Sequence, residues 1–497
     1  MEEIGEHFDP TQEIALSDIK KRAVKGIAVL TSRTLVLNII SFLAQSLLWV
    51  FIEPSEYGVF ILVSATINFL SYFADIGLGA ALIQKKERPK SEDFKTVFFV
   101  QETLVLTIVV IVFLISPVLA RTHSLSHEAV ILLYALNISF FLASLKNIPS
   151  IILERKLEFG KFVIPQVLEN VVYNVILVYF AWKGYGITSF TYAVLVRGVV
   201  GLVAIYILQP WKPGLALSKD SLKSLLKFGI PYQLNNFLAT VKDDGLMIVL
   251  GGILGTYGLG MLGTAQKLSQ YPLRFFMDNV TKVTFPAFSR MQDDKEDLTR
   301  SLNRSIFFIC SLVYPSLVGL AILFPVIISV IPKYQKWEPA FVPLIFLSFN
   351  ASLAASTTQL TNLLTSVGKI KTTLKLMVMW TSLTWLFVPA LSKMWGVNGA
   401  SLGYAIVGSS SFIVYYIVKK FIDWSVINSA VKPLLASVMM GTVLFFTKRI
   451  LPHNTFTLIS LVIIGGISYV LFLYLIVGAS LKDDVKKLYQ AFFPKIL

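Results

Sequence analysis

The chain has 497 residues, of which 55% are hydrophobic and 15% are charged, with a formal net charge of +15 and a mean hydropathy of +0.71. Soluble domains carry about 25% charged residues, so this composition excludes an ordinary soluble protein and indicates one that crosses a membrane several times. The single cysteine excludes a disulfide framework and a cysteine-based metal site. The first 25 residues show no short apolar core with a cleavage site, so no signal peptide is predicted.

Fourteen apolar windows each have the length of about 20 residues that crosses about 30 Å of hydrocarbon as a helix. None resembles the short alternating segments of a membrane β-barrel, so we predict an all-α polytopic membrane protein. The approximate spans are 26–51, 57–83, 95–119, 128–152, 161–182, 186–209, 225–254, 257–281, 305–331, 339–366, 373–393, 396–418, 430–447 and 456–478.

The basic residues predict the orientation of the chain. Of the 44 Lys and Arg, six lie within spans and seven lie in loops that follow odd-numbered spans, which leaves 31 at the two ends of the chain and in the other loops. The positive-inside rule therefore places both termini in the cytoplasm of a multi-pass protein of the cell membrane. This asymmetry accounts for most of the net charge, so no nucleic-acid partner is expected.

The sequence contains traces of an internal duplication. Tyr57-Gly58, at the start of span 2, recurs as Tyr257-Gly258 at the start of span 8. Six spans separate equivalent positions, which predicts parallel repeats. We expect an N-terminal lobe at 26–222 and a C-terminal lobe at 223–420, then two extra helices within 421–480, with cytoplasmic segments at 1–25 and 481–497. Four further positions recur 212 residues later: Gly184, Ser189, Tyr192 and Ala193 as Gly396, Ser401, Tyr404 and Ala405.

Charged residues lie within the first eight spans, away from the span ends. Each would cost roughly 2.5–3.5 kcal/mol at the centre of a bilayer, and a fold of ordinary stability cannot absorb twelve such costs. They must face one another or a wet interior, which is typical of a protein that moves polar cargo. The twelve are Arg33, Asp75, Glu102, Lys146, Glu169, Arg197, Lys242, Asp243, Asp244, Lys267, Arg274 and Asp278.

Four spans carry polar residues at spacings of three or four, which places each set on one helix face. For a single Ser, Thr or Asn, interhelical hydrogen bonding is the alternative reading. Lys267 and Arg274, two turns apart on one face, instead predict an anion site. The sets are Thr34, Asn38, Ser41 and Gln45; Ser64, Asn68, Ser71 and Asp75; Gln233, Asn236, Thr240 and Asp244; and Lys267, Gln270, Arg274 and Asp278.

The other charged residues allow two interpretations. Arg33 could snorkel to the cytoplasmic interface, whereas Lys146 and Arg197 lie deeper. In one interpretation the acids pair with these cations. In the other they titrate or bind Na+ in an ion-coupled cycle, and Asp75, at the end of the span 2 face, is the acid favoured for coupling. The candidate acids are Asp75, Glu102, Glu169, Asp243 and Asp244.

Three weaker signals predict no chemistry. Gly258 to Gly263 matches GxGxxG but opens a membrane helix rather than a βαβ unit, so these glycines, like Gly251 and Gly255, are expected to allow close helix packing. His123 and His127 are read as loop residues rather than metal ligands. No nucleophilic triad or nucleotide-binding loop is present, so no enzyme activity, cofactor or metal is expected, and transport would be powered by gradients or by another protein.

Several short segments of the two halves form a recognisable set. They are Pro54-Ser55-Glu56-Tyr57-Gly58-Val59-Phe60, Phe73-Ala74-Asp75-Ile76-Gly77-Leu78-Gly79-Ala80-Ala81-Leu82-Ile83-Gln84, Gly251 to Gly255, Ala265-Gln266-Lys267-Leu268, Pro272 and Phe285-Pro286-Ala287-Phe288-Ser289. These segments resemble the polysaccharide transporter family, the lipid-linked oligosaccharide flippases of the multidrug/oligosaccharidyl-lipid/polysaccharide superfamily. The resemblance covers spans 1–12, although Leu262 stands where the family often has Tyr.

The resemblance implies two lobes forming a V around a central cavity, alternating between inward-open and outward-open states. It also implies a polyprenyl-diphosphate-linked oligosaccharide as cargo, with Na+ or H+ as a possible coupling ion and glycosyltransferases or a polymerase of the same pathway as partners. A diphosphate needs cations to replace its hydration, and sugars need amides and hydroxyls. The expected binding residues are Arg33, Lys146, Arg197, Lys267 and Arg274 for the diphosphate, and Asn38, Gln45, Asn68 and Gln270 for the sugar.

Three other functions remain open. A drug/cation antiporter of the same superfamily would favour acids and aromatics over Lys and Arg at its site. A peptidoglycan-precursor flippase would use the same chemistry as the favoured function. A membrane polysaccharide polymerase or glycosyltransferase would want a sizeable loop with clustered acids or Arg, and the loops here are short.

Overall fold

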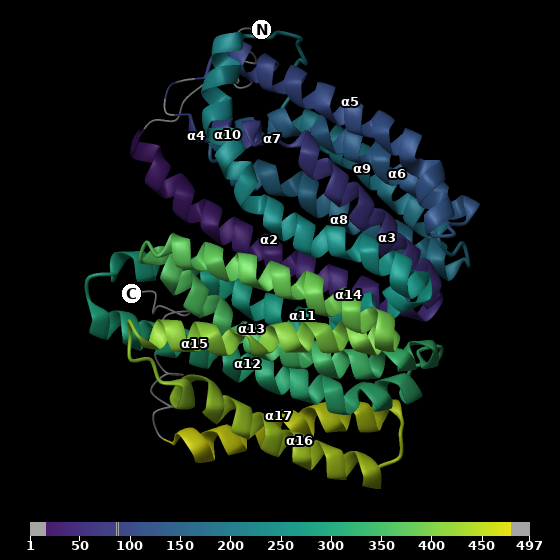
Figure 1. Cartoon of the computed structure of the whole chain (residues 1–497), viewed down its shortest axis with the longest axis vertical. Helices are drawn as coiled ribbons and strands as arrows, with labels where there is room; N and C mark the ends of the chain where they lie inside the picture. Colours follow the sequence, from purple (N-terminus) through teal and green to yellow (C-terminus); the bar gives the residue numbers. More distant parts are fainter. Residues whose placement is uncertain (1–15, 86, 88, 479–497) are drawn as a thin grey trace. The chain divides into compact units, whose positions relative to one another are not determined.

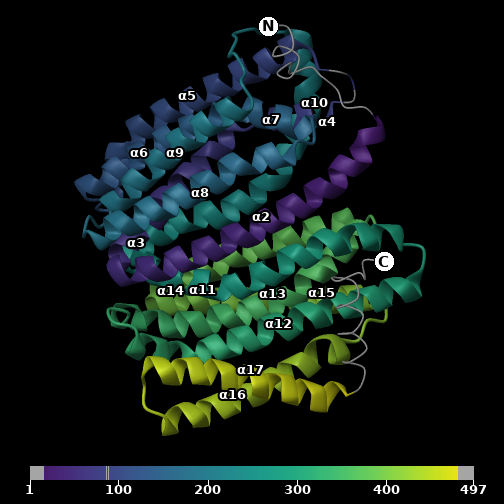
Figure 2. The same ribbon diagram turned by 180° about the vertical axis from the view of Figure 1, so that it is seen from behind.

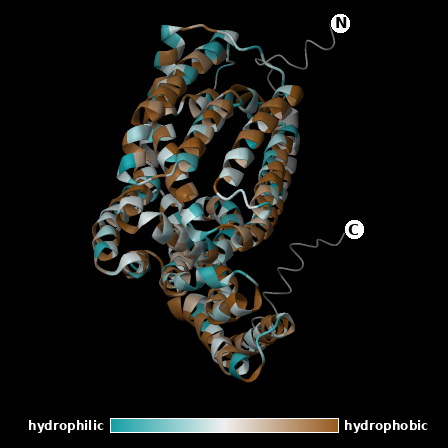
Figure 3. Cartoon of the chain, turned by 90° about the vertical axis from the view of Figure 1, so that its right-hand side faces the viewer, coloured by the Kyte–Doolittle hydropathy of each residue, from teal (hydrophilic) through white to brown (hydrophobic). Residues whose placement is uncertain are grey.

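The computed structural model describes residues 16–478 except 86 and 88, so most of the predicted cytoplasmic segments 1–25 and 481–497 lies outside the described residues. The described residues are almost entirely helical, which confirms the predicted all-α class (Figure 1). The chain divides into two compact units, which we call unit 1 (residues 1–260) and unit 2 (residues 261–497). Large apolar side chains remain exposed along the helices of both units, as membrane-spanning helices require. Hydrophobic residues, coloured brown in Figure 3, recur along these helices.

Unit 1 is a bundle in which α8 packs against α2 and α9, and α6 packs against α5 and α9 (Figures 1 and 2). It also holds α10, which packs against α4 although the sequence analysis assigns it to the second lobe. Its elements are α2 (Leu16–Phe51), α3 (Pro54–Ser71), η1 (Tyr72–Ala74), α4 (Leu78–Gln84), α5 (Ser91–Thr122), α6 (His127–Ser144), α7 (Asn147–Arg155), α8 (Phe159–Trp182), α9 (Thr188–Leu208), α10 (Lys219–Thr240), the π-helical turn η2 (Val241–Gly245) and the first part of α11 (Leu246–Arg290).

Unit 2 is built around α12, which packs against α13 on one side and against α16 and α17 on another. Buried Leu323, Met440 and Leu461 join α12 to the last two helices, so the two extra predicted helices belong to this core. Figure 2 shows the ribbons of α16 and α17 beside that of α12. Besides the rest of α11, the elements are α12 (Lys295–Val330), η3 (Gln335–Ala340), α13 (Phe341–Ser366), α14 (Ile370–Ser409), α15 (Ser411–Lys419), η4 (Ile427–Val431), α16 (Lys432–Ile450) and α17 (Thr455–Val477).

The structure has twelve helical segments long and apolar enough to cross a membrane, among its described residues, where fourteen spans were predicted. Two of the twelve, Phe237–Asp278 and Ile370–Lys419, each cover most of two predicted spans. α11 has 45 residues, about 68 Å of helix, and is broken at Gly255 (φ 65°, ψ 178°). α14 is broken at Gly396 (φ 58°), after which Gly403 packs against the Val388 backbone, so its two arms run side by side. Dividing both segments gives fourteen.

Glycines lie where the backbone turns and where two stretches of backbone approach each other closely. Gly255 was expected to permit close helix packing, and this is wrong: no other atom lies near a Cβ there, and its positive φ makes the break in α11. Gly260 does pack closely, because a Cβ would lie 1.9 Å from the Pro54 carbonyl oxygen. Gly184 and Gly396, equivalent in the predicted duplication, both adopt positive φ (83° and 58°), which is consistent with that duplication.

Candidate functional site

Three charged side chains, from the break between α6 and α7, from α8 and from α9, meet inside unit 1, and we call them the acid–base cluster. Lys146 donates from Nζ to Glu169 Oε1 at 2.7 Å, and Arg197 Nε lies 3.6 Å from Glu169 Oε2. The Lys146 and Glu169 side chains are 16% and 11% exposed, whereas that of Arg197 is 52% exposed. For Glu169, the structure therefore has the pairing with Lys146 and Arg197 that was one of the two alternatives, because a buried charge needs a counter-charge.

Local backbone features place the cluster. The predicted span 4 is not continuous: α6 ends at Ser144 and α7 begins at Asn147, so that Lys146 lies in the break and reaches α8. On α9, a Cβ at Gly201 would lie 1.9 Å from Glu169 Oε1. Glycine at this position therefore gives the carboxylate the space in which it meets both cations.

A second buried acid contacts the residue at which α6 ends. Glu102 of α5 is 8% exposed, and its Oε2 lies 2.9 Å from Ser144 Oγ. Unlike Glu169, Glu102 has no ion pair among the described residues. The two buried candidate acids, Glu169 and Glu102, thus have different surroundings.

The polar face of α2 lies near that of α8. Asn170 donates to Ser41 Oγ at 3.4 Å, and Gln45 is buried. Asn38 and Arg33 are half-buried, and Arg33 Nε has no hydrogen-bond partner among the described residues. The structure thus brings part of the predicted span 1 face against the helix that carries Glu169.

Asp75 does not lie where the sequence analysis expects it. The predicted span 2 is broken after Ser71, and Asp75 follows the short turn η1, so it does not continue the α3 polar face. Its exposed carboxylate accepts from the Gly77 backbone N–H at 2.9 Å. Gly77 has φ 75°, and the Asp75 side chain stabilises this turn by capping it.

The two acids of η2 have separate partners. Asp243 pairs with the adjacent Lys242, with 2.5 Å between Oδ1 and Nζ. Asp244 accepts at Oδ1 from Asn68 of α3 at 3.3 Å. Asn68 is exposed, but its amide contacts this acid as well as solvent.

Unit 2 carries three exposed polar side chains, Lys267, Gln270 and Arg274, which we call the α11 face. Arg274 donates from Nε to Gln270 Oε1 at 3.3 Å, one turn towards the N-terminus. Asp278, one turn the other way, forms no ion pair with Arg274 among the described residues. The guanidinium thus touches a neutral amide, and most of its donors remain available to an anion.

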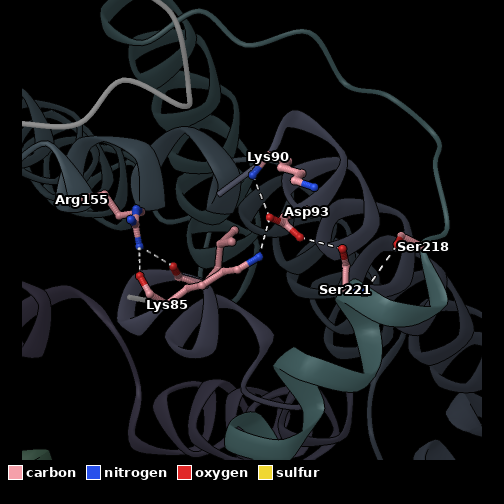
Figure 4. Close-up of polar contacts among 7 residues, drawn as sticks. Lys85, Lys90, Asp93, Arg155, Ser218 and Ser221 are labelled. Atoms are coloured by element: carbon pink, nitrogen blue, oxygen red, sulfur yellow. Dashed lines mark hydrogen bonds and ion pairs between the residues drawn. The ribbon is translucent and has the colours of Figure 1, made fainter. Parts of the chain in front are cut away.

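A polar network at the start of α5 was not predicted from the sequence. Buried Asp93 accepts from Lys85 Nζ and the Lys90 backbone N–H, both at 2.7 Å, and from Ser221 Oγ at 2.6 Å (Figure 4). Arg155 donates to the carbonyl oxygens that end α4, including that of Lys85 at 3.1 Å. The network joins α4, α5, α7 and α10. The available signal was an acid just before a predicted span, where the N-terminal end of a helix favours negative charge.

Comparison with known proteins places the chain in a family. The lipopolysaccharide biosynthesis protein WzxC of Escherichia coli K12 is 22% identical over 412 residues, or 80% of this chain and 81% of its own. The teichuronic acid biosynthesis protein TuaB of Bacillus subtilis 168 is 23% identical over 448 residues, or 86% and 90%. The succinoglycan biosynthesis transport protein ExoT of Rhizobium meliloti is 23% identical over 281 residues, 56% of each chain.

Solved structures share the fold. A lipid II flippase MurJ in an inward closed conformation matches with a TM-score of 0.75 and 18% identity, over 90% of this chain and 98% of its own. An inward-facing multidrug resistance transporter of the MATE family matches with a TM-score of 0.57 and 17% identity, over 80% and 98%.

Residues 47–341, more than half of the chain, match the family described as polysaccharide biosynthesis protein. The chain belongs to that family.

Proposed function

We propose that the protein is a flippase that moves a polyprenyl-diphosphate-linked oligosaccharide across the cytoplasmic membrane for the biosynthesis of a cell-surface polysaccharide. The observation that carries this proposal is the family match over residues 47–341. Relatives named for lipopolysaccharide, teichuronic acid and succinoglycan biosynthesis support it. The fold alone would not assign a cargo, because one fold hosts several functions.

The proposed cycle is alternating access between two six-helix lobes, residues 26–222 and 223–420, with both termini in the cytoplasm. The 31 basic residues on one side against seven on the other support this orientation. The repeated positions at an offset of 212 support the lobes. Glycosyltransferases or a polymerase of the same pathway would supply and consume the cargo.

Lys267 and Arg274 are the proposed diphosphate ligands, and Arg33, Lys146 and Arg197 add positive potential. Exposure of both α11 cations, and the neutral partner of Arg274, support this assignment. Arg grips phosphate oxygens through a fork of donors, whereas Lys acts as a point charge. For the sugar, the proposed contacts are Asn38, Gln45, Asn68 and Gln270.

Coupling is assigned to the acids of unit 1, which would exchange H+ or Na+ during the cycle. Glu169 and Asp243 each already pair with a lysine, and Asp244 accepts from an amide. Asp75 caps a turn and Glu102 contacts a serine. An acid without a cationic partner is the better candidate for taking up an ion.

The cargo can be tested with protein reconstituted into liposomes that carry a tagged lipid in both leaflets, with an impermeant reagent reporting the fraction that crosses. We expect faster crossing of a polyprenyl-diphosphate oligosaccharide than of a polyprenyl-monophosphate sugar. The MurJ-like fold makes lipid II flipping the second candidate, so lipid II and a lipophilic drug cation are the comparison substrates. Transport of lipid II alone, or of the cation alone, would contradict the proposal.

A further inference from the structure

The break between α6 and α7 concentrates tertiary contacts in three consecutive residues. Ser144 contacts Glu102 of α5, and Lys146 reaches α8. The carbonyl oxygen of Leu145, between them, accepts from the Tyr206 hydroxyl of α9 at 3.1 Å. A helix break inside a membrane span leaves backbone groups that must find such partners. Three neighbouring helices are therefore joined at this one point.

The contacts of Ser144 bear on the state of Glu102. Ser144 Oγ lies 2.7 Å from the Phe141 carbonyl oxygen and 2.9 Å from Glu102 Oε2. When Glu102 is a carboxylate, Ser144 is the donor in both contacts, and its one hydrogen must serve two acceptors. When Glu102 is a carboxylic acid, it supplies a second hydrogen, and each contact then has its own.

A second observation agrees. Glu102 is 8% exposed, and its other oxygen, Oε1, is buried and has no hydrogen-bond partner among the described residues. An ionised carboxylate in this position would keep its charge in an apolar region with one oxygen unsatisfied, which is strongly unfavourable. A neutral acid avoids most of that cost. The cation in the break, Lys146, is already held by Glu169.

The surrounding elements supply no counter-charge to Glu102. Apart from Ser144, no described residue forms a hydrogen bond or ion pair with it, and Tyr206 lies within electrostatic reach. The elements packed against α5 are α3, η1, α4, α6 and α10. Their charged and titratable groups, with those next to their ends, are Glu53, Glu56, Tyr57, Tyr72, Asp75, Lys85, His127, Glu128, Tyr134, Lys219, Asp220, Lys223 and Lys227.

We propose that Glu102 is the proton-binding site that couples transport to a proton gradient. This inference rests on the proposed function and narrows its coupling ion to H+. In the state described, the proton is bonded to Glu102 Oε2 and shared with Ser144 Oγ. Release transfers that proton to water and leaves a carboxylate, and the Ser144 hydroxyl turns from the Phe141 carbonyl to donate to Oε2. Rebinding of one proton reverses both changes.

Infrared spectroscopy of the purified protein tests the site without any cargo. We expect wild type at neutral pH to show the C=O stretch of a protonated carboxyl, shifted in D2O, and Glu102→Gln to lose it. Glu128→Gln, an exposed glutamate on α6, is the matched control and should keep the band. Ser144→Ala should move the band to higher frequency by removing its hydrogen-bond acceptor. A band absent from wild type, or retained in Glu102→Gln, would overturn the proposal.

Transport tests the coupling. In liposomes, an imposed pH gradient should change the flipping rate of wild type and of Glu128→Gln, and this response should be lost in Glu102→Gln. A rate that responds only to Na+, or a pH response that persists in Glu102→Gln, would overturn the coupling role. If no lipid-linked oligosaccharide is flipped while the Glu102 band is present, the proposed function fails and the proton site stands.

Discussion

The acid–base cluster of unit 1 and the α11 face of unit 2 hold their cations in opposite ways. Lys146 is buried and paired with Glu169, and Arg197 approaches the same carboxylate. On the α11 face, Lys267 and Arg274 are exposed, and Arg274 contacts only a neutral amide among the described residues. A paired buried cation stabilises the fold and must lose its partner before it can bind an anion. An exposed guanidinium with unused donors can bind phosphate directly.

The largest effect is expected from removing the shared acid of the cluster. Glu169→Met leaves the buried Lys146 ammonium without a counter-charge, which should cost about 3–5 kcal/mol of unfolding free energy. Thermal unfolding of the purified protein measures it. The double variant Lys146→Met with Glu169→Met, which leaves no unpaired buried charge, should recover most of the loss. Equal destabilisation of the single and double variants would show that the pair is not what stabilises this region.

Arg274→Ala should do the reverse, leaving the unfolding midpoint nearly unchanged and weakening the binding of diphosphate lipid. Loss of one or two charge-assisted hydrogen bonds, about 1.5–3 kcal/mol, corresponds to roughly 10- to 150-fold in affinity. Arg274→Lys should retain part of the binding, and should still harm it more than Lys267→Arg does.

Two controls sharpen the Arg274 prediction. Lys282→Ala removes an exposed cation of the same helix outside the α11 face and should leave binding intact. Because Arg274 does not pair with Asp278, adding Asp278→Ala to Arg274→Ala should restore nothing. Recovery of binding in that double variant would mean that Arg274 serves an ion pair instead of the cargo.

Gly201→Ala should disturb the cluster from its neighbouring helix. The added methyl would lie 1.9 Å from Glu169 Oε1 and push the carboxylate from Lys146, at a cost of about 1–3 kcal/mol. Gly198→Ala, one turn earlier on α9, meets the flexible Leu142 side chain at 3.0 Å and should cost less. Unfolding midpoints of the two variants provide the comparison. Similar midpoints would contradict the tight fit around Glu169.

The smallest effect on stability is expected at Arg197. Its side chain is 52% exposed and its contact with Glu169 is long, so Arg197→Ala should cost no more than about 1 kcal/mol. Flipping rates measured at low and high salt would then separate its proposed contribution to positive potential from its role in the fold. A loss of stability as large as that of Glu169→Met would place Arg197 in the paired core of the cluster.

Hydropathy and helical spacing predicted the helical class and nearly all of the spans, because apolar runs of membrane length have no other stable structure. They could not predict the breaks at Ser71–Gly77 and at Leu145–Lys146. No proline lies in either break, and the backbone groups freed there are satisfied by partners distant in sequence, such as Tyr206. Gly255 was assigned to packing because its positive φ has no sequence signature.

The site could be predicted only as a set of residues. Spacing placed Lys267, Gln270 and Arg274 on one face because that relation is local to a helix. Which cation holds Glu169 depends on how α7, α8 and α9 pack, and no local spacing encodes it. Asp93 was missed for the same reason: its partners Lys85 and Ser221 meet it only after α4 and α10 have packed.

The central claim is that the exposed cations of α11, rather than the paired cations of the cluster, bind the diphosphate. A photoreactive polyprenyl diphosphate bound to the protein and cross-linked, with the labelled peptide identified by mass spectrometry, tests it most directly. The account predicts label within residues 261–290, competed by unlabelled polyprenyl diphosphate but not by polyprenol, and lost in Arg274→Ala. Label confined to α8 and α9, unchanged in Arg274→Ala, would contradict it.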